Sequence, residues 1–272
     1  MSNFVFEDKA VYYEVVGEGR PLMLLNGIMM STKSWAPFLP ALKQAGIQAL
    51  LVDLLDQGQS EAMERDFPIQ LQAEMLEALL THLQIPKIDI FGTSYGGEVA
   101  LNLAASRPDL VDRMVLANTV ARTNAWLKEI GEAWILAGNN PRAYYATTIP
   151  VIYSPQFYDR KAEWMENRKL LLTEIAFAST SFQTRMARLT RSAESHDVTE
   201  QLGNIPCPTL LISSQQDHIT PYEEQALLAE GMPNAELVML PQTGHASFYE
   251  RPDLFTALLI GFLSHRDRVV LP

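Results

Sequence analysis

Three residues of the chain have the side chains that nucleophilic catalysis at a carbonyl group requires. They are Ser94, Asp217 and His245, which follow one another in that order along the sequence. A serine hydroxyl is a weak nucleophile at neutral pH, but a neutral imidazole can remove its proton and later return it to the leaving group. A carboxylate on the other ring nitrogen fixes the tautomer of the imidazole and stabilises the imidazolium. Together the three residue types predict acyl transfer through a serine nucleophile.

The serine lies in the sequence GTSYGG, residues 92–97. A short apolar run at 88–91 precedes it, and an alanine- and leucine-rich stretch at 98–105 follows it. This order predicts a strand, a very tight turn and a helix, the context that the pattern Gly-x-Ser-x-Gly requires of a nucleophile. The same pattern also occurs in ordinary glycine-rich turns that carry a solvated serine. The rest of the chain must therefore supply a base, an acid and donors for an oxyanion.

His245 is the expected base among the five histidines of the chain. It follows the apolar run 235–240 and a short turn, so we expect it just beyond the end of a strand. Of the others, His82 lies near a helix end and His196 lies after a long helical region. His218 is directly beside the expected acid, and His265 is in the C-terminal tail.

Asp217 is the expected acid because it also follows a predicted strand, at residues 208–213. Asp53 and Asp56 are the competing carboxylates, and they follow a different strand, predicted over 47–52. We expect these two to support the structure of their own loop.

The backbone should supply the donors that stabilise a tetrahedral oxyanion. The residue after the nucleophile begins a helix, so the N–H group of Tyr95 is one expected donor. The loop after the buried strand at 22–25 should supply the other, and we expect it to be the N–H group of Ile28.

An alternation of strands and helices is needed to bring these residues together, and the sequence shows one. A continuous apolar run typical of a strand buried on both faces occurs at 22–25. Further strands are expected at 47–52, 88–91, 111–117, 208–213 and 235–240. Two more strands are expected at 4–6 and 10–16, and helical spacing appears at 31–45, 67–83 and 252–263. The pattern predicts an α/β fold with a mostly parallel central sheet flanked by helices.

Residues 119–196 interrupt the alternation because they show helix-like stretches, including 155–164 and 169–178, and no convincing strand. An all-helical insertion between two core strands is expected to form a cap or lid. We therefore expect a core of residues 1–118 and 197–272 and a cap of residues 119–196. The cap is rich in methionine and aromatic residues, which predicts an apolar substrate pocket. The residues expected to line this pocket are Asn26, Met29, Trp35, Trp126 and Trp134.

Composition argues against several other classes of protein. The 272 residues carry a net charge of −11 without a cluster of Lys and Arg, which argues against nucleic-acid binding. The single cysteine, Cys207, excludes an internal disulfide and a cysteine-based metal site. The N-terminal sequence lacks the pattern of a signal peptide, and no apolar run is long enough to predict a membrane span. We expect a cytoplasmic protein that acts on a small molecule without a cofactor or a metal.

These motifs resemble those of the α/β-hydrolase superfamily with a helical cap, over nearly the whole chain. The matching pieces are residues 24–27 with Trp35, 53–60, 92–97, Asp217 with 220–221, and 244–245. The resemblance implies serine esterase chemistry, with Ser94 as nucleophile, His245 as base and Asp217 as acid. The chain departs from the common pattern at Asn26, where many members have His. It also departs at 55–60, where many members have Arg-Gly-x-Gly-x-Ser.

Two branches of the superfamily are similar to this chain. Asn26, Trp35 and the size of the cap resemble the enol-lactonase and carboxylesterase branch, whereas residues 25–29 and 58–60 resemble the hydroxyacyl-carrier-protein acyltransferases. The acyltransferases have Trp after the serine, where this chain has Tyr95. We therefore expect hydrolysis of a carboxylic ester, lactone or thioester with an apolar acyl or aryl group. Acyl transfer, carbon–carbon bond hydrolysis, cofactor-free oxidation and non-catalytic ligand sensing stay open as alternatives.

Overall fold

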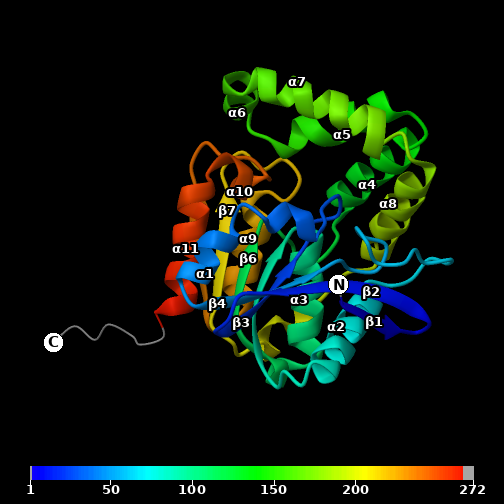
Figure 1. Cartoon of the computed structure of the whole chain (residues 1–272). Coiled ribbons are helices and arrows are strands. Elements are labelled where there is room, and N and C mark those ends of the chain that lie inside the picture. The colour runs from blue at the N-terminus through cyan, green and yellow to red at the C-terminus, as the bar shows by residue number, and fades with distance from the viewer. Residues whose placement is uncertain (1, 266–272) are drawn as a thin grey trace.

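The computed structural model describes residues 2–265, and within them one eight-stranded sheet runs through the centre of the molecule (Figure 1). The strand order is β1-β2-β4-β3-β5-β6-β7-β8, with β1 and β2 antiparallel and β3 to β8 parallel. The strand bounds are β1 Ser2–Phe6, β2 Lys9–Val16, β3 Arg20–Leu25, β4 Ile47–Val52, β5 Ile88–Thr93, β6 Val111–Ala117, β7 Thr209–Ser214 and β8 Ala235–Leu240. The expected mostly parallel α/β sheet is confirmed.

Helices cover both faces of the sheet. Successive residues of a central strand point to opposite faces, so each such strand contributes side chains to both of the cores beneath these helices. On one face, Leu22 and Leu24 of β3 belong to a core that includes α1 (Leu39–Gln44) and α11 (Pro252–Ser264). On the other face, Met23 and Leu25 pack into the core that contains α2 (Gln70–His82), α3 (Tyr95–Ser106) and α9 (Tyr222–Gly231).

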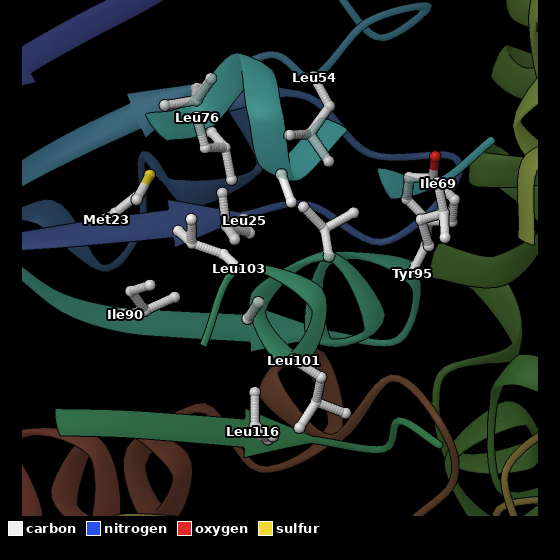
Figure 2. Close-up of a cluster of buried hydrophobic side chains, with 14 of the residues drawn as sticks. Met23, Leu25, Leu54, Ile69, Leu76, Ile90, Tyr95, Leu101, Leu103 and Leu116 are labelled. Carbon is white, nitrogen blue, oxygen red and sulfur yellow. The ribbon is translucent and has the colours of Figure 1, made fainter. Parts of the chain in front are cut away.

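Figure 2 shows the second of these cores in detail. Leu76 of α2 and Leu103 of α3 face the side chains of Met23 and Leu25 on the sheet. All four side chains are fully buried, with an exposed fraction of 0%. The packing fixes α3 against the sheet, and α3 is the helix that begins directly after Ser94.

Five helices and a π-helical turn lie between β6 and β7 in the chain. They gather beyond one end of the sheet, at the top and right of Figure 1. Their bounds are α4 Ala125–Ala137, α5 Pro141–Ile152, α6 Pro155–Arg160, α7 Ala162–Leu171, η3 Leu172–Ala176 and α8 Thr180–Ala193. Asn124, Asn140, Ser154 and Ser179 accept hydrogen bonds from the first turns of α4, α5, α6 and α8, which sets where these helices begin.

Three helix predictions differ from the structure. The expected helix over 31–45 is a short 3₁₀ turn, η1 (Thr32–Trp35), followed by α1. Pro37 lies between η1 and α1, and Pro40 lies in the first turn of α1, so the chain lacks two N–H groups that a continuous helix over 31–45 would need. Helices were also expected at 155–164 and 169–178. In the structure the first of them, α6, already ends at Arg160, and after Lys161 a second helical run extends from Ala162 through α7 and η3 to Ala176.

Three short turns complete the described elements: η2 (Pro108–Leu110), η4 (Thr199–Asn204) and α10 (Ser247–Glu250). Within residues 2–265, no helix has both the length and the apolar character that a bilayer crossing needs. The last residues of the expected core, 266–272, lie outside the described part of the chain.

Candidate active site

Ser94, Asp217 and His245 all lie beyond the carboxyl ends of parallel strands. Ser94 directly follows β5, Asp217 follows β7, and His245 follows β8. Because parallel strands end at the same edge of a sheet, the three loops open on the same side of the molecule. This edge is where an α/β sheet offers a crevice for ligands.

Ser94 has a backbone conformation that few residues adopt, with φ 52° and ψ −124°. The strand and helix that flank it approach so closely that a Cβ atom on Gly92 would lie 2.6 Å from the carbonyl oxygen of Gly96. A Cβ atom on Gly96 would lie 2.5 Å from the carbonyl oxygen of Leu25. Both positions therefore require glycine, and the turn presents Ser94 at the N-terminus of α3.

The His245 imidazole is held by a complete set of contacts on its Asp217 side. Nδ1 of His245 lies 2.7 Å from Oδ2 of Asp217, and both side chains are buried. The other oxygen of Asp217 accepts hydrogen bonds from the N–H groups of Ile219 (2.8 Å) and Thr220 (2.9 Å). The Thr220 hydroxyl donates to Oδ2 at 2.8 Å. An imidazole placed in this way presents its other nitrogen, Nε2, as the proton acceptor.

The loop that carries His245 is also held from the end of β6, two strands away from β8 in the sheet. The Asn118 side-chain amide donates to the carbonyl oxygen of His245 at 2.6 Å and to the Ser247 hydroxyl at 3.2 Å. Asn118 is fully buried and has φ 49°, a conformation that Asn tolerates better than most residues. Sequence analysis assigned Asn118 no role, because nothing local indicates a partner 127 residues away.

The two expected oxyanion donors lie beside Ser94. Ile28, Ser94 and Tyr95 line a common cavity, and a Cβ atom on Gly27 would lie 3.7 Å from Cβ of Ser94. The Tyr95 hydroxyl is turned away into the core, where it bonds with the hydroxyl of Ser192 at 2.8 Å. Tyr95 can therefore serve this cavity through its backbone rather than its phenol.

Comparison with known proteins agrees with this geometry. A family model described as the alpha/beta hydrolase fold matches residues 20–252. The chain belongs to the α/β-hydrolase family. A solved structure of MGS-M2, an α/β-hydrolase enzyme from a Medee basin deep-sea metagenome library, is 46% identical, covers 99% of each chain and has a TM-score of 0.96.

Two further α/β-hydrolase comparisons are informative. A Pseudomonas syringae protein provisionally named carbamate hydrolase RutD is 32% identical over 249 residues, which is 89% of this chain and 93% of the relative. The enol-lactonase from Burkholderia xenovorans shares the fold, with a TM-score of 0.84, at 22% identity, and the match covers 97% of this chain and 100% of the enol-lactonase. These relatives are hydrolases, and the chain is an enzyme of the same superfamily.

Two cavities of this α/β-hydrolase meet at Ser94. The larger, about 100 Å³ and here named the His245 cavity, is lined by both Ser94 and His245. The smaller, about 60 Å³ and here named the Glu98 cavity, is lined by Ser94 and Glu98. Ile28, Ser94 and Trp134 line both of them. Most of the remaining wall of the His245 cavity is apolar and includes Met29, Met30, Ile149, Ile152 and Phe248.

The pocket prediction needs correction at three residues. Met29 and Trp134 line the His245 cavity, whereas Asn26, Trp35 and Trp126 line neither cavity. Asn26 is fully buried, accepts a 2.7 Å bond from the Trp35 indole and donates to the Val52 carbonyl at 2.8 Å. These two residues therefore fix the loop before Ile28 from inside the core.

Trp126 fails as a pocket residue for a different reason. Its side chain is 57% exposed and lies on the outside of α4, where its indole N–H reaches the His218 carbonyl at 3.3 Å. Sequence analysis treated it like Trp134, because a tryptophan in an apolar helical pattern gives no indication of which face it occupies.

The competing carboxylates have partners of their own. Asp53 accepts bonds from the N–H groups of Thr32 (2.6 Å) and Gln59 (2.8 Å). Asp56 forms a two-point ion pair with Arg188 of α8, with distances of 2.7 and 2.8 Å. Both carboxylates thus support loop structure and leave Asp217 as the carboxylate in contact with His245.

Sequence analysis missed several residues of the cavities. Glu98, Tyr153 and Arg168 line them, and burial raises the pKa of the Tyr153 phenol to about 12, so this phenol is neutral at ordinary pH. Glu98 could have been noticed, because it is the one acidic residue of the otherwise apolar and small-residue stretch 95–105. Within residues 2–265, no three His, Cys, Asp or Glu side chains are grouped so that they could hold a metal ion.

Proposed function

We propose that the protein is a serine hydrolase that cleaves a carboxylic ester, lactone or thioester through an acyl-enzyme. The observation that carries the proposal is the 2.7 Å contact between His245 Nδ1 and Asp217 Oδ2, next to a cavity that His245 shares with Ser94. The conformation of Ser94 at the start of α3 supports the same assignment, because it exposes the hydroxyl where helix N–H groups and a positive helix end are available.

The proposed reaction begins with attack of the Ser94 hydroxyl oxygen on the substrate carbonyl carbon, while His245 takes the hydroxyl proton. The N–H groups of Tyr95 and Ile28 stabilise the tetrahedral oxyanion. His245 then returns the proton to the departing alcohol or thiol as the bond between it and the carbonyl carbon breaks. A water molecule, deprotonated by His245, then attacks the acyl carbonyl carbon, and the bond to the Ser94 oxygen breaks as His245 returns the proton to that oxygen, which releases the free acid.

We include in this proposal the role of residues 119–196 as a cap over the active site. Trp134 of α4 and Ile149 of α5 line the His245 cavity together with Ser94, so helices of this segment contribute to the space around the nucleophile. The mostly apolar lining favours a substrate with an apolar part.

The experiment is to label the protein with a fluorophosphonate and to measure its intact mass, with Ser94→Ala as the paired variant. We expect one adduct on the native protein and none on the variant. Hydrolysis of p-nitrophenyl esters of increasing chain length then sizes the cavity. Absence of an adduct on folded protein would argue against an activated serine and in favour of a non-catalytic ligand sensor.

The relatives named as carbamate hydrolases suggest a second candidate substrate, in which a nitrogen atom is attached to the carbonyl carbon. The same serine chemistry would apply to such a bond. Comparing p-nitrophenyl N-methylcarbamate with p-nitrophenyl acetate tests it, and we expect turnover of the carbamate rather than lasting inactivation if this candidate is correct.

A further inference from the structure

The Glu98 cavity contains a carboxyl group that the proposed catalytic steps do not use. Glu98 lies in the first turn of α3, is only 4% exposed, and has a side-chain oxygen, Oε2, without a hydrogen-bond partner among the described residues. The surrounding wall is largely apolar and includes Leu127, Ile130 and Ile219. Buried polar groups in proteins are nearly always paired, so an unpaired one at a cavity indicates a partner that arrives from outside.

The electrostatic setting of Glu98 favours its neutral form. Burial raises the pKa of its carboxyl from an ordinary value of 4.5 to about 8, and no neighbouring charge contributes to that shift. The charged groups at this cavity, besides Glu98, are Lys128 of α4 and Glu194 directly after α8, and both are exposed. A protonated carboxyl offers one O–H donor and a carbonyl acceptor, so it suits a neutral group that donates and accepts hydrogen bonds.

The geometry also distinguishes the two sides of the substrate. His245 must reach the leaving group to return a proton to it, and His245 lines the larger cavity but not the Glu98 cavity. The leaving group therefore belongs in the His245 cavity. Ser94 and Ile28 line both cavities, whereas Tyr95, the other expected oxyanion donor, lines the Glu98 cavity and not the His245 cavity, which favours the Glu98 cavity for the acyl substituent.

We infer that the Glu98 cavity is the acyl subsite and that Glu98 binds a hydroxyl or N–H group carried by a short acyl chain. The inference rests on the proposed hydrolase function. A cavity of about 60 Å³ admits only a small group, since one water molecule needs about 10–15 Å³. The apolar part of the substrate is then the leaving group, in the His245 cavity.

Two esters of equal size provide the test: p-nitrophenyl 3-hydroxybutyrate and p-nitrophenyl 3-methylbutyrate, which differ by a hydroxyl in place of a methyl group. The kcat/KM for each is divided by its rate of hydrolysis by hydroxide, which removes the difference in intrinsic reactivity. We expect the native enzyme to prefer the hydroxy ester by about tenfold or more, because the methyl ester leaves the carboxyl unpaired.

Three variants locate the source of this preference. Glu98→Leu should lower the ratio by about tenfold or more, whereas Glu98→Gln, which keeps a neutral donor and acceptor, should keep it within about threefold. Glu129→Leu removes an exposed carboxylate of α4 that lines neither cavity, and it should keep the native ratio. Fluorophosphonate labelling of each variant shows that it is folded with an active Ser94.

The outcomes separate this inference from the proposed function. The deciding quantity is the kcat/KM for the hydroxy ester divided by that for the methyl ester, each corrected for its rate of hydrolysis by hydroxide. If the native enzyme hydrolyses both esters and this ratio is one or less, the acyl subsite is overturned and the hydrolase proposal stands. An equal ratio in native enzyme and Glu98→Leu would do the same. If Glu98→Leu does not fold, the native ratio decides. Failure to hydrolyse either ester, together with no fluorophosphonate adduct, would overturn both proposals.

Discussion

The side-chain amide of Asn118 donates a 2.6 Å hydrogen bond to the backbone carbonyl of His245. This bond ties the end of β6 to the loop after β8, across the strand β7 that lies between them in the sheet. Asp217 orients the imidazole ring of His245, whereas Asn118 holds the backbone from which the ring projects. The position of the expected base thus depends on two neighbouring strand ends.

Replacing Asn118 tests this positioning role. We expect Asn118→Ala to lower kcat for a p-nitrophenyl ester by about 10- to 100-fold with little change in KM, because a base displaced by a fraction of an ångström transfers protons poorly. Asn118→Asp at pH 8 keeps the shape and the tolerance of positive φ but removes the donor. If kcat falls equally in both variants, the hydrogen bond from Asn118 is what positions His245. If kcat falls in the alanine variant alone, the volume of the Asn118 side chain is what matters, and the positioning role of the hydrogen bond is contradicted.

The ion pair between Arg188 and Asp56 should stabilise the attachment of α8 to the loop after β4. Asp56 is fully buried and Arg188 is 9% exposed, so Arg188→Met leaves a buried carboxylate with fewer partners. We expect a loss of about 3 kcal/mol in the free energy of unfolding, measured with urea. Arg191→Met on the same helix breaks an exposed 3.5 Å pair with Asp66 and should cost less than about 1 kcal/mol.

Glycine at position 96 should be indispensable, and the chain offers a matched control. Gly96→Ala places a Cβ atom 2.5 Å from a backbone oxygen of β3, where neither element can move freely. We expect a loss of about 3 kcal/mol or more in the free energy of unfolding and of most esterase activity. Gly203→Ala has no heavy atom within 4 Å of its new Cβ atom. Its melting temperature and activity should stay close to those of the native protein.

The buried Glu98 carboxyl should make stability depend on pH. Its pKa is about 8 in the folded protein and about 4.5 in the unfolded chain, so the native state binds a proton that the unfolded state has released. Stability therefore falls as pH rises from 4.5 to 8. The Glu98→Gln variant lacks this titration. As pH rises, its free energy of unfolding should increase relative to that of the native protein, by at most about 1.4 kcal/mol for each unit of difference between the two pKa values.

Melting temperatures at pH 4.5, 7 and 9 measure this effect. The advantage of Glu98→Gln should be smallest at pH 4.5 and largest at pH 9. Glu194→Gln removes an exposed carboxylate and serves as the control. A constant difference between the Glu98 variant and the native protein over the three pH values would contradict the proposed protonation of Glu98.

Local sequence patterns were enough to predict several strands and the turn at Ser94. The strands at 47–52, 111–117 and 235–240 match β4, β6 and β8 to the residue, because short, mostly apolar runs bounded by turn residues are typical of strands. The turn at Ser94 was also predictable, since its glycines reflect close contacts between adjacent elements. The helices of 119–196 were harder to delimit, because their ends depend on caps and on packing within the segment.

Contacts between distant parts of the chain could not be predicted in the same way. The bonds from Asn118 to His245 and from Asp56 to Arg188 join residues 127 and 132 positions apart. The inward or outward orientation of Trp134 and Trp126 depends on which face of α4 meets the rest of the protein. Asn26 looked like a pocket residue because it ends a strand, yet its amide is bound within the core.

The distribution of the site over β5, β7 and β8 also has a consequence for protein synthesis. A ribosome-bound chain that has been completed only through α8 contains Ser94 and its glycine turn, but neither Asp217 nor His245 has yet been added. Such a chain carries the proposed nucleophile without the proposed base that would activate it. In a translating system, the proposed esterase activity should consequently appear only after β8, the last strand of the sheet, and His245 have been made. The time between the synthesis of His245 and the appearance of activity would then report how quickly β7 and β8 join the strands already folded.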